Sequence, residues 1–242
     1  NTAGGRPAGV PFTITLDAGQ SYQVQSALAA LDITGSTIRA TTTSGACRPF
    51  AVFSGSMCAN VPVTCPACDH IVEQMVPTDK WGRNFHTMPM LGASTYTYRI
   101  LADQNNTAVS IDGGAAIMLN AGQSHQVNGA SQPVCLTADK PVSVAQLMEG
   151  FNCASIGDPS MIELAPDERM STSAVFTTPA SAQIGQHSVS VIMATAAIGQ
   201  LNLDGAPISA SLFQPFPACN AYAHATIPVG TGAHRISSPQ GF

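Results

Sequence analysis

A short stretch of this chain occurs twice, and the repetition limits the possible folds more than any other feature. LDAGQSYQV at 16–24 returns as LNAGQSHQV at 119–127. A third, degenerate copy, IPVGTGAHRI, lies at 227–236, where His234 aligns with His125. The spacing of roughly 100 residues is too long for one blade of a WD-type propeller. The chain is therefore predicted to contain about two to three imperfect repeats of one unit.

The segments that precede the second and third copies also resemble each other. TYTYRILADQNNTAVSIDG at 95–113 matches HSVSVIMATAAIGQLNLDG at 187–205, and both end in Asp-Gly. Asp-Gly is a strong hairpin signal because both residues tolerate a positive φ. We divide the chain into a partial first repeat at 1–94, a second repeat at 95–185 and a partial third repeat at 186–242.

The local pattern favours strands over helices along the whole chain. Runs that alternate or are rich in β-branched residues, bounded by Gly, Asn, Asp and Pro, predict strands. These runs lie at 12–16, 36–41, 94–101, 108–112 and 187–193. One short helical turn is expected within 158–170, interrupted by Pro166. We expect an all-β fold of antiparallel strands, either sandwich-like or propeller-like.

The composition argues against nucleic-acid binding and against a transmembrane helix. Charged residues make up 10% of the chain, the formal net charge is −5, and Lys80 and Lys140 are its two lysines. Phosphate binding needs clustered Lys and Arg, so nucleic acid is not an expected partner. No apolar run approaches the roughly 18 residues of a transmembrane helix.

Residues 58–74, CANVPVTCPACDHIVEQ, raise the choice between a metal site and disulfide bonds. Cys58, Cys65, Cys68 and His70 are ligand types that zinc accepts. However, a single residue separates Cys68 from His70, and the gap from Cys58 to Cys65 is also atypical for zinc. Disulfides that close the loop fit better, and no metal or cofactor is expected.

The chain has seven cysteines, and a secreted, oxidising setting suits them. The surrounding sequence is rich in Ser, Thr, Gly and Ala and poor in Lys and Glu, which is typical of secreted β proteins. An odd count leaves one cysteine free or paired elsewhere. The cysteines are Cys47, Cys58, Cys65, Cys68, Cys135, Cys153 and Cys219.

Several motifs resemble the IgGFc-binding protein N-terminal domain family. They are RPFAVFSGSMCANVP at 48–62, CDHIVEQMVP at 68–77, WGRNFHTMPM at 81–90, GDPSMIELAP at 157–166 and HRISSPQGF at 234–242. The resemblance covers nearly the whole chain. It implies an extracellular or cell-surface, non-enzymatic β module that serves binding, adhesion or structural assembly. It does not imply that this chain binds antibody.

The resemblance also suggests how the cysteines pair. The family's usual pattern carries equivalents of Cys58 and Cys68, so Cys47 and Cys65 are additions to it. The implied pairs are Cys58–Cys68, Cys47–Cys65 and Cys135–Cys153, with Cys219 left over.

Asp69, His70 and Glu73 follow the cysteine loop and have two interpretations. They resemble an acid–base set, but no Gly-x-Ser-x-Gly elbow supplies a nucleophile. The favoured interpretation is a structural corner in which Asp69 and His70 cap a turn and Glu73 supports it.

Three aromatic residues and one asparagine are candidate surface features. Trp81 could stack on a sugar ring or anchor the loop from beneath, and Tyr96 and Tyr98 share one face of a strand that is either a contact surface or core. Asn105 begins the sequon Asn-Asn-Thr at an expected hairpin tip, which is a possible glycosylation site or an ordinary polar turn.

Three functions remain open. The first is an adhesion or assembly module, whose partner is a protein, a glycoprotein or another copy, joined by strand addition at an unpaired edge. The second is a carbohydrate- or glycoprotein-binding module that uses Trp81, Tyr96 and Tyr98. The third is a zinc-dependent hydrolase centred on Cys65, Cys68 and His70.

Overall fold

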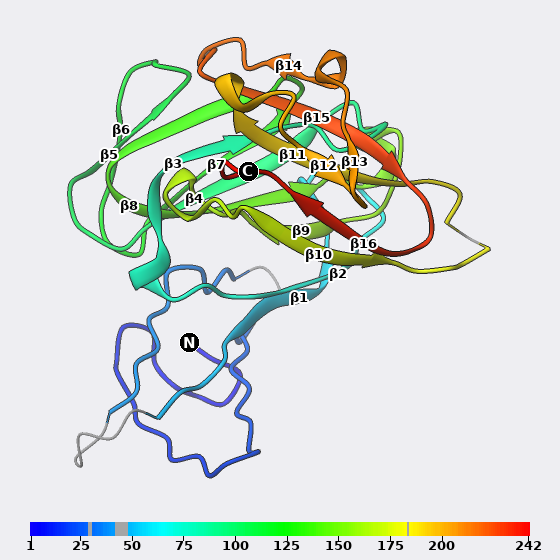
Figure 1. The fold of residues 1–242 in the computed structure, drawn as a ribbon. Helices are drawn as coiled ribbons and strands as arrows, with labels where there is room; N and C mark the ends of the chain where they lie inside the picture. Colours follow the sequence, from blue (N-terminus) through cyan, green and yellow to red (C-terminus); the bar gives the residue numbers. More distant parts are fainter. Residues whose placement is uncertain (29–30, 42–47, 183) are drawn as a thin grey trace.

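The computed structural model describes residues 1–242 apart from 29–30, 42–47 and 183. It is an all-β protein whose paired strands are antiparallel, which confirms the expected fold class (Figure 1). Its strands are β1 (Phe53–Ala59), β2 (Asp69–Gln74), β3 (Gly82–Thr87), β4 (Tyr96–Ala102), β5 (Thr107–Ile111), β6 (Ile117–Leu119), β7 (Ser124–Ala130), β8 (Val134–Met148), β9 (Ser160–Glu163), β10 (Ser173–Thr178), β11 (His187–Ala194), β12 (Asn202–Leu203), β13 (Ala206–Pro207), β14 (Gln214–Pro215), β15 (Tyr222–Val229) and β16 (Gly232–Ser237). Its helical turns are α1 (Phe151–Ala154), η1 (Thr78–Lys80), η2 (Asp167–Arg169), η3 (Thr195–Ala197) and η4 (Ala210–Leu212).

The long strand β8 organises a seven-stranded sheet. Strands β4 and β5 pair with successive stretches of β8, and β3 and β9 also pair with it. The sheet continues outward to β7 beyond β4 and to β6 beyond β5. One strand therefore holds most of this sheet together.

The strands of the C-terminal part form two smaller sheets. Their orders are β10-β16-β12-β13 and β11-β15-β14. Their inward side chains, which include Val191, Met193, Leu201 and Ile236, form a second apolar core.

The first apolar core lies on the seven-stranded sheet and includes Tyr96, Tyr98, Phe85 and Ile100. Both tyrosine rings are buried, so the two residues are core and not a ligand-contact surface. The Tyr96 hydroxyl donates to the Gln132 carbonyl at 2.8 Å. The alternation that placed these tyrosines on one face was predicted correctly, but that face points inward.

Residues 1–52 contain no strand within their described part, so the strands expected at 12–16 and 36–41 are wrong. In Figure 1 this segment lies below the sheets as a set of loops. An ion pair of 2.7 Å between Asp32 and Arg99 of β4 ties it to the sheets. Local β propensity does not form a strand unless a neighbouring segment supplies hydrogen bonds, and no described residue pairs with 12–16 or 36–41 as a strand.

Both Asp-Gly turns were predicted correctly. Asp112 and Gly113 have φ values of 50° and 71°, and Asp204 and Gly205 have 52° and 81°. Positive φ at both central residues is the signature of a tight hairpin turn. These turns join β5 to β6 and β12 to β13.

The short helical turn expected within 158–170 is present as η2, which begins after Pro166 and is preceded by β9. The hairpin expected at Asn105 needs correction. Asn105 lies in an exposed turn, but that turn joins β4 to β5, which pair with β8 and not with each other. The division into three repeats stays a prediction.

Candidate functional site

A disulfide between Cys58 and Cys68 closes the loop that joins β1 to β2. Its Cα atoms are 5.0 Å apart, and it is the pair that the family resemblance implied. The strands it joins form a two-stranded ribbon, called here the β1–β2 ribbon, with Phe53 opposite Gln74 and Gly55 opposite Val72. The cross-link therefore fixes the end of the ribbon.

The other two cysteine pairs differ from the expectation. Cys65 bonds to Cys153, not to Cys47, and Cys135 bonds to Cys219, not to Cys153. The fold brings buried Cys65 beside α1, while Cys135 on β8 faces the segment before β15. Sequence separation gave no guide to either pair. Cys47 lies outside the described residues.

These pairings overturn the zinc hydrolase centred on Cys65, Cys68 and His70. Both sulfur atoms are committed to disulfides, and thiolates are the form that binds metal. The His70 side chain is 75% exposed and pairs with the Asp69 carboxylate at 2.9 Å.

The β1–β2 ribbon presents an exposed apolar face. Residues directly opposite each other share a face of an antiparallel pair, so Phe53 and Val72, which lie opposite Gln74 and Gly55, share one face. Met57 follows along β1, within the register shift between Ser56 and Ala59. The exposed fractions of Phe53, Met57 and Val72 are 65%, 82% and 59%. Within the part of the chain that the structure describes, β1 pairs with β2 alone. The outer edge of β1 is therefore open to pairing.

The other side of the ribbon is fixed to the seven-stranded sheet. Strand β2 lies against β9, and Glu163 of β9 accepts a hydrogen bond of 2.7 Å from the Val76 backbone. The second oxygen of Glu163 accepts from Ser143 at 2.8 Å. Within the ribbon, β1 approaches β2 so closely at Gly55 that a Cβ there would meet the Ile71 carbonyl. This position of β1 therefore requires glycine.

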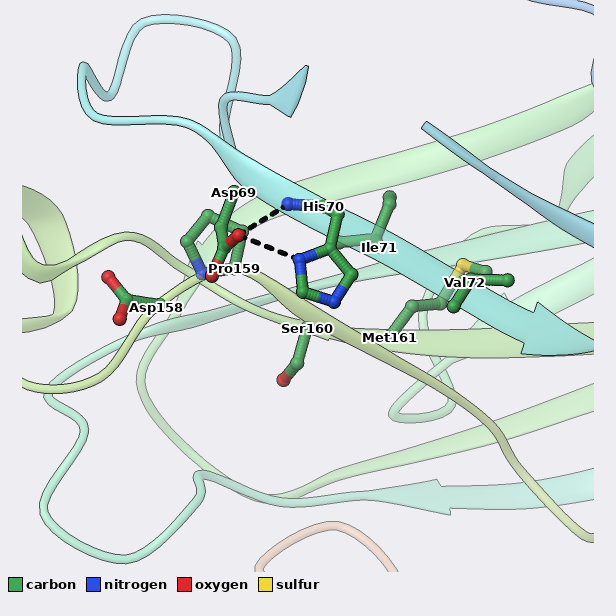
Figure 2. Close-up of a pocket in the computed structure, with 8 residues that line it drawn as sticks. All are labelled: Asp69, His70, Ile71, Val72, Asp158, Pro159, Ser160 and Met161. Carbon is green, nitrogen blue, oxygen red and sulfur yellow. Dashed lines mark hydrogen bonds and ion pairs between the residues drawn. The ribbon is translucent and has the colours of Figure 1, made fainter. Parts of the chain in front are cut away.

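Two of the sequence motifs meet at a shallow pocket of about 340 Å³ beside the ribbon (Figure 2). Asp69 and His70 come from the Cys-Asp-His motif, and Asp158, Pro159 and Ser160 come from the Gly-Asp-Pro segment. The segments face each other because β2 lies against β9. Of the expected corner residues, Glu73 lies opposite Ser54 farther along the ribbon.

Asp69 and His70 interact mainly with each other. The Asp69 carboxylate accepts from the His70 backbone N–H at 2.7 Å and lies 2.9 Å from Nδ1 of its ring. These hydrogen bonds, the backbone one foremost, lower the pKa of the Asp69 carboxyl group. Among the described residues, no hydrogen bond joins Ser160 to His70, so no nucleophile–base pair is assembled. Asp69 and His70 thus form a local hydrogen-bonded pair at the start of β2, beside the exposed apolar face of the ribbon.

Trp81 borders a second pocket, of about 320 Å³, which Val142 and Ser143 of β8 also line. Its ring nitrogen donates to the Val76 carbonyl at 3.0 Å, and the ring is half-buried. Lys80 and Arg169 lie at the same pocket, whose apolar lining includes Phe85 and Leu164. Trp81 thus anchors its segment and leaves part of its ring accessible.

Two arrangements of polar groups were missed by sequence reasoning. Glu149 is buried and accepts hydrogen bonds from Thr95, Thr97 and the Gly129 backbone. His86, also buried, contacts the Cys135–Cys219 disulfide. The hydrogen-bond and disulfide partners of both residues are distant in sequence, so no local pattern predicts these contacts.

Fold and cross-links together define a disulfide-linked, antiparallel β module with an exposed apolar ribbon. The comparison with known families identifies it further: the IgGFc binding protein family model matches residues 1–242, and the chain belongs to that family. The family's members are extracellular β-rich binding modules, which the three disulfides fit.

A human relative, IgGFc-binding protein of Homo sapiens, is 26% identical over 230 residues. The match covers 93% of this chain but 4% of the relative, so the chain spans a small part of its length. No solved structure matches the chain. None of the described helices is long and apolar enough to cross a membrane.

Proposed function

We propose that this chain is a non-enzymatic adhesion and assembly module that joins other copies of itself by strand addition at β1. The observation that carries the proposal is the β1–β2 ribbon, whose edge is open and which exposes Phe53, Met57 and Val72. An added strand would gain main-chain hydrogen bonds along β1 and cover apolar side chains. Open, apolar edges are sites at which β proteins associate.

The chain also offers a strand to donate. Residues 10–16 alternate, and their apolar members Val10, Phe12, Ile14 and Leu16 are all exposed and lie outside any strand. This segment has the pattern of a strand without a partner. An extended donor of this length matches β1, which runs from Phe53 to Ala59.

Charge does little to oppose such pairing. Within 10–16 and within β1 there is no Asp, Glu, Lys or Arg. Charged side chains on an edge are a common protection against association, and neither segment has one. Donor and acceptor lie on the same chain, so copies would join head to tail.

Sedimentation velocity over a range of concentrations tests the proposal. We expect the wild-type chain to associate as its concentration rises, and Met57→Lys in the acceptor or Ile14→Lys in the donor to weaken association at least tenfold. Mixing the two variants should restore a complex, because each retains the surface that the other lacks. Val63→Lys is the matched control, since Val63 is 82% exposed but lies outside the strands. A wild-type chain that stays monomeric, or an equal effect of Val63→Lys, would refute strand addition.

A second candidate function is binding of a carbohydrate at the Trp81 pocket. The accessible part of the indole and the neighbouring Lys80 and Arg169 support an acidic sugar. Trp81→Phe keeps an aromatic ring in the segment and should lower glycan-array signals, whereas an array without signals for the wild-type chain would remove this candidate.

A further inference from the structure

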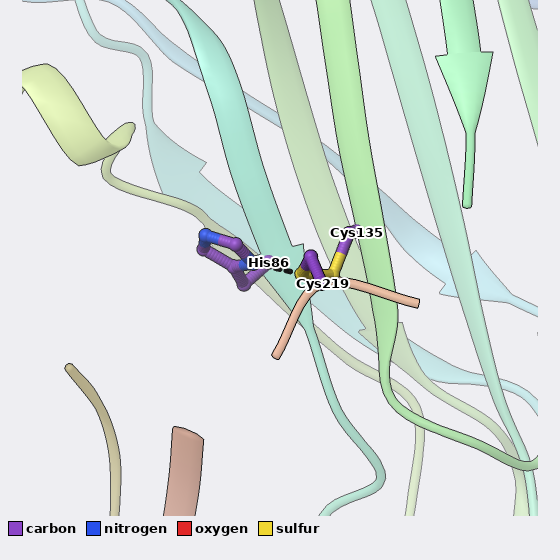
Figure 3. Close-up of side chains that lie close together, drawn as sticks. All are labelled: His86, Cys135 and Cys219. Carbon is purple, nitrogen blue, oxygen red and sulfur yellow. Dashed lines mark hydrogen bonds between the residues drawn. A yellow bond between two sulfur atoms is a disulfide. The ribbon is translucent and has the colours of Figure 1, made fainter. Parts of the chain in front are cut away.

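His86 of β3 lies against the disulfide that joins the two apolar cores. Cys135 is on β8 of the first sheet, and Cys219 lies between β14 and β15. The ring nitrogen Nδ1 of His86 is 3.7 Å from the Cys219 sulfur. Figure 3 shows this contact beside the Cys135–Cys219 disulfide. The ligand atoms of all three residues lie within 4.8 Å of one another.

The His86 ring is held in a defined orientation. Its Nε2 lies 3.1 Å from the Asp167 carboxylate, and the ring packs in tilted orientations against Phe216 and Tyr222 at centroid distances of 4.9 and 4.2 Å. A proton on Nε2 leaves the lone pair on Nδ1, directed at the sulfur atoms. A carboxylate on the outer nitrogen of a histidine is the usual support of a metal-binding imidazole.

The charges around the cluster favour a cation. The Asp167 carboxylate lies 3.1 Å from Nε2 of His86, and the Glu168 carboxylate accepts a hydrogen bond of 3.0 Å from the Arg83 backbone on the same strand. Asp112 adds a third carboxylate, which accepts a hydrogen bond of 2.8 Å from the Cys135 backbone. A buried Cys135 thiolate and a partly buried Cys219 thiolate beside these carboxylates would be unfavourable unless a cation compensated them.

We propose that the reduced form of this site binds one Zn²⁺ through His86 Nδ1 and the sulfur atoms of Cys135 and Cys219. A dithiol reductant transfers two electrons to the Cys135–Cys219 bond and is itself oxidised to a disulfide. The two protein thiols that result each release a proton when zinc binds. The same residues then serve as a covalent cross-link when oxidised and as a metal centre when reduced.

The geometry suits zinc after the sulfur–sulfur bond opens. Zinc–sulfur bonds of about 2.3 Å and zinc–nitrogen bonds of about 2.0 Å place tetrahedral ligands roughly 3.5–3.8 Å apart. The separation of Nδ1 from the Cys219 sulfur is already 3.7 Å. Cys219 is half-exposed, so an ion has a path to the site and water can take the fourth position.

Titration of the dithiol-treated protein with Co²⁺ and then Zn²⁺ tests the proposal. We expect one tetrahedral cobalt–thiolate chromophore per chain, displaced by Zn²⁺, and protection of Cys135 and Cys219 from alkylation as read by mass spectrometry. His86→Ala should weaken binding by more than tenfold, and Asp167→Asn by about 10–100-fold. The untreated, oxidised protein should bind no metal at this site.

Two controls separate this site from other released thiols. The Cys58→Ser/Cys68→Ser variant should keep the cobalt signal, and His125→Ala should leave the affinity unchanged. Near-ultraviolet circular dichroism reports whether each reduced variant stays folded. The proposal is overturned if the reduced chain unfolds and holds no metal, or if binding survives in Cys135→Ser/Cys219→Ser or in His86→Ala.

Discussion

The backbone N–H of Cys135 donates to Oδ1 of Asp112, and the Asp112 N–H donates back to the Cys135 carbonyl, both at 2.8 Å. Asp204 and Arg235 exchange the same two hydrogen bonds at the same distances. Both aspartates occupy Asp-Gly turns with positive φ. The two turns, which the sequence comparison aligned, thus dock on a neighbouring strand in the same way.

We predict that Asp112→Ala lowers the free energy of unfolding by about 1–3 kcal/mol. The alanine leaves the Cys135 N–H without its acceptor and is poorly suited to a positive φ. Chemical denaturation measures the loss. Asp112→Asn is the control, because asparagine keeps an oxygen at this position and tolerates the turn, so its cost should be smaller.

Removing the Glu149 carboxylate should be more damaging. Glu149→Ala leaves two threonine hydroxyls and the Gly129 N–H without their buried acceptor, and we expect a loss of about 3 kcal/mol or more. Thermal and denaturant unfolding test this. Glu163→Ala removes a carboxylate that is less buried, so it should lower the free energy of unfolding by less. Equal losses of stability in the two variants would contradict the argument from burial.

The disulfides should differ in their contributions. The Cys65–Cys153 bond spans a sequence separation of 88 and the Cys58–Cys68 bond one of 10. The chain-entropy model gives about 4–5 kcal/mol for the longer loop and about 3 kcal/mol for the shorter. Replacing each pair with serines, followed by denaturant unfolding, should show that order. Peptide mapping of the oxidised protein checks the connectivity itself.

The pKa values of two histidines should be shifted in opposite directions from the ordinary value of about 6.5. Hydrogen bonds to Asp204 and to the Gly230 carbonyl raise the pKa of His234, while burial lowers the pKa of His224. NMR titration of the ring protons measures both. Asp204→Asn should bring the pKa of His234 back down and leave that of His224 unchanged.

The pKa shifts of His234 and His224 make the folding stability depend on pH. The stabilisation from His234 is fully present below its unfolded-state pKa and is lost as the pH rises through its higher folded-state pKa. The contribution of His224 has the opposite sign. Stability is lost as the pH falls below the unfolded-state pKa toward the lower folded-state value, because the unfolded chain binds the proton first.

The structural features that were predicted correctly are those set by residues close together in the sequence. The strands expected at 94–101, 108–112 and 187–193 correspond to β4, β5 and β11, and the Asp-Gly turns have the expected backbone. The strand expected at 12–16 is wrong, although its alternation is as clear, because strands need a partner that local pattern cannot reveal. For the same reason Tyr96 and Tyr98 were placed on one face correctly without showing that the face is buried.

The candidate site was predictable only in part. The Cys58–Cys68 loop and the Asp69–His70 corner are local, and the structure places them together. The Cys65–Cys153 and Cys135–Cys219 bonds depend on how whole sheets meet, as does the contact of His86 with Asp167.

Amide hydrogen exchange of residues 53–59 at low and high protein concentration tests the central claim most directly. Strand addition predicts that amides of β1 become protected as concentration rises, together with those of residues 10–16, and that Met57→Lys abolishes both changes. Exchange in β1 that stays fast and independent of concentration, in a chain whose sheets are fully protected, would contradict the account.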